Sequence, residues 1–308
     1  MKKLALLVLL LLLFGGGYLF LSSGKGKSIN LADLVAQLNP NKTPFQKLDS
    51  ALSKTVGVKT LYVDFNMEDT GLITLVSKGV TQTIQANVSG YISGSTDGKT
   101  QKMELNISSP SNPGVSIVIS VMSLEDGTWF VKSPTTAGKW QKYTKEEYEK
   151  ESAGNSLDAS LYGLNILASV FDESKALFKT IQKETVESLP SETVEGKTYD
   201  KYSAEISIPD FISALPLSSN VTEKDVSDSK IILKDAVMRV TLSVDRSTNY
   251  VTKIVIDAKH LTFIPNDESE KMGVSTVYDI VTTADLSRFD VPTNISAPDP
   301  SEVISNTF

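Results

Sequence analysis

The residue types that most often carry enzyme chemistry are scarce in this chain of 308 residues. It has no cysteine and a single histidine, His260, so thiol catalysis, disulfides, thiolate metal sites and a histidine-rich metal centre are excluded. His260 stands in an alternating pattern typical of a strand, and no Ser-His-Asp or histidine–metal arrangement can be assembled around it. We interpret it as a strand residue, and we expect the protein not to be an enzyme and to use no cofactor. A hydrolase would need a base beside a nucleophile in a polar cleft, which the sequence does not indicate.

Two acidic stretches have the residue types that bind calcium. Asp267, Glu268 and Glu270 lie in PNDESEK, and Asp225 and Asp228 lie in EKDVSD. Neither stretch has the spacing or the central glycine of a calcium loop, so we interpret both as polar loops and expect no metal. The formal net charge of −7, with lysines interleaved among acids, also argues against nucleic acid as a partner, because phosphate binding needs clustered cations.

The aromatic residues of GTWFVKSPTTAGKWQKY (127–143) could form a stacking platform or hold two strands together. The segment contains both tryptophans of the chain, Trp129 and Trp140. Its alternation puts Trp129 with Val131 on one face and Trp140 with Lys142 on a face opposite Tyr143. A platform needs its aromatics exposed together with basic neighbours, so we predict a hairpin with cross-strand aromatic packing instead.

The N-terminus has the pattern of an export or anchoring segment. Two lysines precede an uncharged stretch, residues 4–21, which as a helix would span about 27 Å against a bilayer core of ~30 Å. A cleaved signal peptide usually has a shorter apolar region, but Ser22 and Gly24 are small enough for a cleavage site. Both alternatives, a membrane-spanning signal anchor and a cleaved signal peptide, place the remaining chain outside the cytoplasmic membrane.

Helical and strand periodicities succeed one another along the rest of the chain. A short helix is predicted before Pro40, and a longer one from Pro44 with Thr43 as its cap. From residue 59 the apolar period changes to two, with Asp-Gly turns at 96–99 and 125–128. Strands are predicted again from 183 to 207 and from 239 to 286. This order predicts an α+β domain whose antiparallel sheet has one apolar face, with helices gathered on that face.

The middle of the chain carries the candidate binding residues. Residues 156–171 are apolar almost all round, wider than the stripe of an ordinary surface helix, and PDFISALPL (209–217) adds a second apolar piece. The stripe is interpreted either as ordinary core packing or as a lid over a lipid cavity. In the second case the residues that line the cavity are Leu161, Leu164, Ala168, Phe171, Phe211 and Leu215, with Ile117 and Ile119 facing them from the sheet.

The phrases G-x-W-F-V-K…G-K-W-x-K-Y, V-T-K-I-V-I-D and F-D-V-P…I-S-A-P, in this order of elements, resemble the LolA-like and LppX/LprG-like lipoprotein and lipid carriers over residues 43–300. The resemblance implies a strongly curved, unclosed antiparallel half-barrel with helices across its concave face, and acyl chains received in the concavity. Many such proteins carry a lipidated cysteine after the signal peptide. This chain has none, so residues 4–21 would be its membrane anchor.

These observations predict three regions: a signal anchor or signal peptide at 1–24, a linker with a short helix at 25–42, and a LolA-like domain at 43–308. We expect an extracytoplasmic protein of the bacterial cell envelope that carries or senses a lipid, or the acyl chain of a lipoprotein, in an apolar cavity. The alternative is a non-catalytic, membrane-anchored envelope module that binds another protein and has a packed, ligand-free core.

Overall fold

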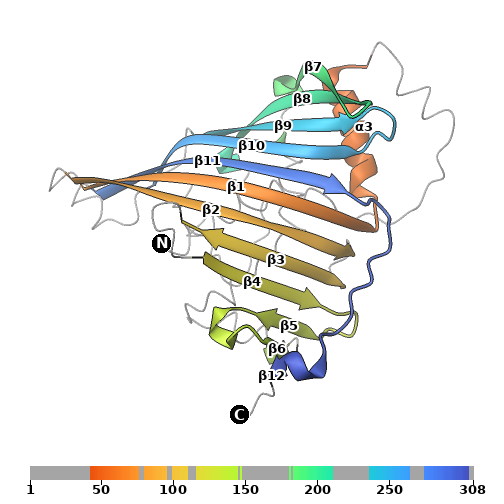
Figure 1. The fold of residues 1–308 in the computed structure, drawn as a ribbon. Helices are drawn as coiled ribbons and strands as arrows, with labels where there is room; N and C mark the ends of the chain where they lie inside the picture. The colour runs from red at the N-terminus through yellow and green to blue at the C-terminus, as the bar shows by residue number, and fades with distance from the viewer. Residues whose placement is uncertain are drawn as a thin grey trace.

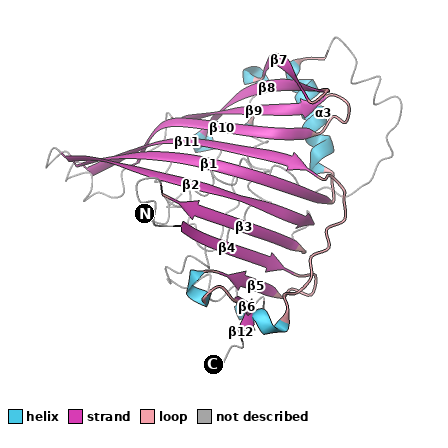
Figure 2. Cartoon of the chain, in the orientation of Figure 1, coloured by secondary structure: helices cyan, strands magenta, loops and turns pink. Residues whose placement is uncertain are grey.

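The computed structural model describes residues 42–75, 80–95, 99–109, 116–144, 146–147, 180–181, 183–210, 236–263 and 274–304. The helices predicted before Pro40 and at 156–171 lie outside these ranges. Figure 1 shows that a single large, twisted sheet dominates the described part, and Figure 2 shows how few of its residues are helical.

The twelve strands among the described residues form one unclosed sheet. Their order is β12-β6-β5-β4-β3-β2-β1-β11-β10-β9-β8-β7, so β12 and β7 are its two edges. All described pairs are antiparallel except β12 with β6. The bounds are β1 Thr60–Leu75, β2 Val80–Ser95, β3 Gln101–Ser108, β4 Ser116–Ser123, β5 Trp129–Lys132, β6 Trp140–Tyr143, β7 Glu187–Val194, β8 Lys197–Ser207, β9 Val237–Asp245, β10 Val251–Phe263, β11 Val274–Ser287 and β12 Val303–Ile304.

The alternation predicted from the sequence separates two faces of this sheet. In β4, Ile119 is 2% exposed whereas its neighbour Val118 is 46% exposed. Successive side chains of a strand point to opposite faces, and the same alternation in β1 buries Val63, Phe65 and Met67 in one large core cluster. We call the face that carries this cluster the inner face and the opposite one the outer face.

The aromatic segment 127–143 forms the predicted hairpin, β5 with β6. Trp129 lies opposite Tyr143, and both pack with the inner-face cluster. Trp140 is on the outer face, where it forms a second buried cluster with Met122 and Phe130. The prediction of cross-strand aromatic packing is confirmed, and the two tryptophans stabilise opposite faces of the same hairpin.

The proline-rich tail does more than end the domain, which is all that the sequence suggested. After β11, residues 288–304, which we call the strap, run past the ends of the neighbouring strands to the far side of the sheet (Figure 1). The strap ends in a 3-10 turn, Pro300–Glu302, and in β12, which pairs with β6. Ile295 and Val303 pack against the second cluster. The strap therefore covers an edge that would otherwise expose unpaired backbone groups.

The β7 edge is protected by its own sequence. Pro190 has no N–H to offer an incoming strand, and the pairing register with β8 shifts between Leu189 and Glu192. The strand is exposed along nearly its whole length and carries acidic side chains. Proline, an irregular register and charge all discourage edge-to-edge association.

The predicted helix after Thr43 is α3, Pro44–Val56. Thr43 and Gln46 form a reciprocal capping box, in which each side chain accepts a hydrogen bond from the other residue's backbone N–H, at 3.3 and 3.0 Å. Pro44 occupies the first turn, where a missing N–H costs nothing. Sequence alone therefore determined where this helix begins.

Candidate functional site

The inner face is crossed by a continuous line of directly paired residues, which we call the central row. Its members, from β8 to β4, are Tyr202, Leu242, Ile254, Ala284, Phe65, Gly90, Leu105 and Ile119. None is charged, and all except Gly90 are at most 4% exposed. Eight strands at a spacing of about 4.8 Å extend over roughly 34 Å.

Small residues flank the aromatic ring at the middle of the central row. Phe65 lies between Ala284 and Gly90 in the register, and its ring covers Gly90. A Cβ built on Gly90 would lie 3.1 Å from Phe65 Cζ and only 2.0 Å from the carbonyl oxygen of Glu104 on β3. Only glycine permits so close an approach of β2 to β3.

Two of the predicted cavity residues lie on this surface. Ile119 ends the central row, and Ile117, half-buried, packs against the same cluster. The other six, Leu161, Leu164, Ala168, Phe171, Phe211 and Leu215, lie outside the described residues, so their placement stays a prediction. The adjoining residues 208–210 are helical, and the buried Ile208 belongs to the inner-face cluster.

Helix α3 packs against the inner face at one end of β8–β11 (Figure 1). Leu48, Ala51 and Leu52 belong to the same cluster as the central row. The fully buried Thr55 donates from Oγ1 to the Ala51 carbonyl at 2.7 Å and accepts from the Val251 N–H at 2.9 Å. One side chain thus joins α3 to the first residue of β10.

A second joint fixes the C-terminal end of α3. The Lys54 ammonium donates to the Thr248 carbonyl and lies 4.6 Å from the centre of the Tyr250 ring. That ring stacks on Phe289, with centroids 4.4 Å apart. Because Phe289 belongs to the strap, the helix, the β9–β10 turn and the strap meet at this point.

A polar cluster lies where the central row reaches β8. Arg246, in the β9–β10 turn, donates from Nε and Nη2 to the carboxylate of Asp200, and from Nη2 to Ser191 Oγ at 3.2 Å. Ser191 donates in turn to Asp200 at 2.9 Å. Burial alone would raise the pKa of Asp200, but these hydrogen bonds and the Arg246 charge lower it below its ordinary value.

Tyr202 joins this cluster to the apolar surface. It follows Asp200 by two residues in β8, so both side chains are on the same face. Burial, with a smaller effect of the negative Asp200, raises the pKa of Tyr202 to about 12. The sequence analysis missed this cluster. Alternation indicates that Asp200 and Tyr202 lie on the same face of one strand, but it does not indicate that the turn containing Arg246 lies beside them.

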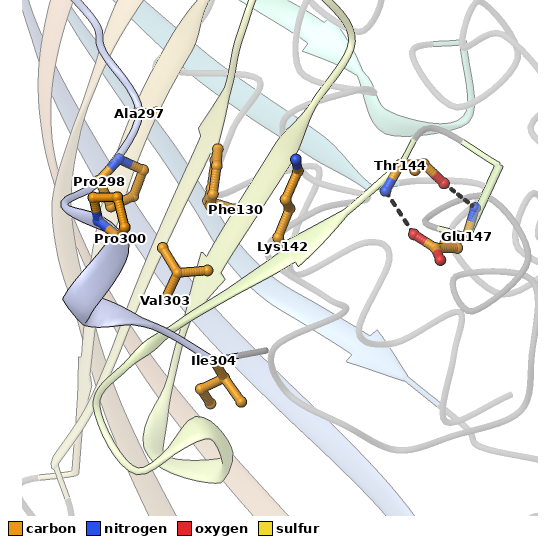
Figure 3. A pocket seen from close by; sticks show the side chains of 9 residues that line it. All are labelled: Phe130, Lys142, Thr144, Glu147, Ala297, Pro298, Pro300, Val303 and Ile304. Carbon is orange, nitrogen blue, oxygen red and sulfur yellow. Dashed lines mark hydrogen bonds between the residues drawn. The ribbon is translucent and has the colours of Figure 1, made fainter. Parts of the chain in front are cut away.

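The strap and the β5–β6 hairpin enclose a groove of about 560 Å³ (Figure 3). Lys142, Thr144 and Glu147 line its polar end, and the remaining lining is mainly apolar: Phe130, Ala297, Pro298, Pro300, Val303 and Ile304. Thr144 and Glu147 hydrogen bond each other reciprocally, at 2.8 and 3.2 Å. Phe130 and Lys142 are outer-face residues, so the groove is separate from the central row, and we interpret it as the joint between strap and hairpin.

Neither the single histidine nor the acidic residues form a metal site among the described residues. His260 lies in β10, as predicted. In the described ranges, no group of three or more acidic or histidine residues could hold a metal ion; the two acidic stretches discussed above lie elsewhere. The absence of enzymatic activity stays a prediction.

None of the helices among the described residues is long and apolar enough to cross a bilayer. The predicted anchor at 1–24 lies outside those residues.

No family model and no curated protein sequence matches the chain. Among solved structures, it is similar to the lipoprotein LppX from Mycobacterium tuberculosis, with 10% identity, a TM-score of 0.38 and coverage of 82% of this chain and 98% of that one. LprF from Mycobacterium bovis has 14% identity, a TM-score of 0.42 and coverage of 83% and 96%. A Vibrio parahaemolyticus domain provisionally designated an outer membrane lipoprotein-sorting protein has 10% identity, a TM-score of 0.23 and coverage of 81% and 93%.

LppX is one of the proteins that the sequence phrases resemble, and it is among the solved structures similar to this chain. This likeness transfers neither a binding site nor a ligand to this chain.

Proposed function

We propose that the protein is a non-enzymatic, extracytoplasmic lipid-binding protein that holds acyl chains against the central row. The chains would belong to a free lipid or to a lipoprotein. The N-terminal segment 1–24 supports the location, either as a membrane anchor or as a cleaved export signal. Carriage and sensing of the lipid are both compatible with such binding.

The observation that carries this proposal is the uncharged central row on an unclosed sheet. Its length of about 34 Å exceeds the ~15 Å depth of one bilayer leaflet, half of the ~30 Å hydrocarbon core. Each methylene removed from water there contributes about 0.8 kcal/mol. An acyl chain along this surface could therefore be held without any charged contact to the chain itself.

Helices on the inner face would complete the cavity. Among the described helices, α3 already packs there through Leu48, Ala51 and Leu52. We infer that the apolar residues of 156–171 and of 209–217 cover the remainder and separate from the sheet when lipid enters.

A second function has one observation in its favour. The inner-face side chains are already buried, with Met67, Ile92 and Met103 at 0% exposure. A packed, ligand-free core would give the same burial. In that case the protein would be an anchored envelope module whose partner is another protein.

Native mass spectrometry of the chain purified from its own cells tests the proposal directly. We expect the protein to retain mass that lipid extraction identifies as acyl-containing. Replacing Ile119 by phenylalanine enlarges a central-row side chain, and Val118→Phe is the matched control on the outer face of the same strand. If lipid lies on the row, Ile119→Phe lowers the lipid content with little loss of stability, and Val118→Phe leaves it unchanged.

The packed-core alternative predicts the opposite result. Lipid would be absent from the wild-type protein, and Ile119→Phe would lower the free energy of unfolding by about 1–3 kcal/mol, because a well-packed core does not admit extra volume. Crosslinking in cells would then yield protein adducts without lipid. This pair of results would refute lipid binding.

A further inference from the structure

The polar cluster at the Tyr202 end of the central row has hydrogen-bonding capacity left over. Arg246 gives Nε and Nη2 to Asp200 and Ser191, and within the described part of the chain its Nη1 group has no acceptor. The Arg246 side chain is 55% exposed and that of Asp200 is 32% exposed. The guanidinium is therefore held in place on one edge and open to a ligand on the other.

A second cation, on α3, acts electrostatically on the same carboxylate. Lys47 is close enough to Asp200 for its charge to help lower the pKa of that carboxyl, and no carboxylate among the described residues forms an ion pair with Lys47. The charges of two cations thus act on one carboxylate here, and one of the two, Arg246, contacts it directly.

We propose that Arg246 and Lys47 bind the anionic head group, a phosphate or carboxylate, of the amphiphile whose acyl chain lies on the central row. This inference rests on the proposed function and adds the chemical class of the ligand. Asp200 precedes Tyr202 by two residues, about 7 Å along the strand, so a head group at Arg246 is adjacent to the end of the row. Guanidinium groups suit such oxyanions because they offer paired N–H donors in one plane.

The outer face provides a comparison that separates this site from an ordinary surface ion pair. Arg239 on β9 donates to Glu205 on β8 at 3.0 Å, with both side chains more than half exposed. The kind of ion pair is the same as that of Arg246 and Asp200, but Arg239 lies on the outer face of β9, away from the apolar surface. Arg239→Gln is therefore the matched control for Arg246→Gln.

The test uses the full-length chain and two lipids that differ only by a phosphate, 1-palmitoyl lysophosphatidic acid and 1-palmitoyl glycerol. Dissociation constants are measured below the micellar concentration of each lipid for the wild type and for Arg246→Gln, Lys47→Gln and Arg239→Gln. One exposed charge-assisted contact corresponds to about a five-fold change in affinity. We expect the wild type to prefer the phosphate lipid by about ten-fold, with two such contacts partly offset by Asp200.

Arg246→Gln and Lys47→Gln should each lower that preference about three- to five-fold, through the loss of one contact, while Arg239→Gln leaves it unchanged. Circular dichroism and thermal unfolding of each variant establish that it is folded. If Arg246→Gln does not fold, the test rests on Lys47→Gln, whose preference for the phosphate lipid over the uncharged lipid should be lower than that of the wild type.

Other outcomes overturn the inference in distinguishable ways. Equal binding of the two lipids by the wild type refutes the head-group site and leaves acyl binding intact. Binding of neither lipid refutes the proposed function and the head-group site together. Glycerol 3-phosphate, included as a third probe, should not bind alone at millimolar concentration; if it binds as tightly as the phosphate lipid, the cluster is a site for free anions. An equal loss in Arg239→Gln would show a general effect of surface charge.

Discussion

Replacing Gly90 by alanine tests whether the close approach of β2 to β3 constrains the central row. The added Cβ would lie 2.0 Å from the Glu104 carbonyl oxygen and 3.1 Å from Phe65 Cζ. The ring can move by a few tenths of an ångström, but the carbonyl belongs to a paired strand. Overpacking in a core costs typically 1–3 kcal/mol, and because relief here requires a backbone shift we expect a loss near the upper limit, about 3 kcal/mol.

Gly57→Ala is the matched control. Gly57 caps the end of α3 with φ −79° and ψ −6°, a conformation that alanine adopts freely. The nearest atom to its Cβ would be the Lys54 carbonyl oxygen at 3.4 Å, which is an ordinary contact. Because alanine restricts the unfolded chain, we expect this variant to be neutral or up to about 1 kcal/mol more stable than the wild type.

Urea unfolding, followed by far-ultraviolet circular dichroism and by tryptophan fluorescence, measures both changes. The midpoint for Gly90→Ala should fall while the dependence of the unfolding free energy on urea stays constant. At roughly 2–4 °C per kcal/mol for a domain of about this size, its melting temperature should fall by about 6–12 °C. A Gly90→Ala protein within 1 kcal/mol of Gly57→Ala would refute the reasoning, because the two strands could then separate at no cost.

Two further predictions concern the end of the sheet where α3 packs. Thr55→Val keeps the side-chain shape but leaves the buried Val251 N–H without its acceptor, so we expect the free energy of unfolding in urea to fall by about 1–3 kcal/mol. The control Thr60→Val should lose less than about 1 kcal/mol, because the exposed carbonyl of its partner Val291 can bond water instead. Equal losses in the two variants would show that the buried hydrogen bond to α3 stabilises the protein no more than an exposed one. Tyr202 has its pKa raised from 10.0 to about 12, so its contribution to stability is complete below pH 10 and is lost as the pH rises from 10 towards 12. In Tyr202→Phe the unfolding free energy should decline less steeply between pH 10 and 12, by the slope that corresponds to one proton. An identical decline in both proteins would contradict the raised pKa of Tyr202.

The local features of the fold were predictable because each depends on neighbours in the sequence. The faces of β4 follow from alternation alone, as the burial of Ile119 and the exposure of Val118 confirm. Thr43 and Gln46 determine the start of α3, since a cap needs only residues three positions apart. The β5–β6 hairpin and the division of its tryptophans between two faces follow in the same way.

The composition of the central row was only partly predictable. Periodicity indicates which residues of a strand face inward, and it brought Ile117 and Ile119 into the predicted cavity. It does not indicate which strand lies beside which, because backbone hydrogen bonds are the same for any pair of strands. The contacts of Phe65 with Ala284, more than two hundred positions later, and with Gly90 depend on the strand order β2-β1-β11.

What the sequence determined by itself is therefore the alternation of buried and exposed residues, the helix cap, the aromatic hairpin and the scarcity of catalytic residue types. Only the tertiary structure decided that the strap pairs with β6, that Gly90 meets the Glu104 carbonyl, and that Arg246 and Asp200 lie together at the end of an apolar surface. The physical reason is the same in each case. Local rules act over a few residues, whereas these contacts exist only after the twelve strands have taken their order in the sheet.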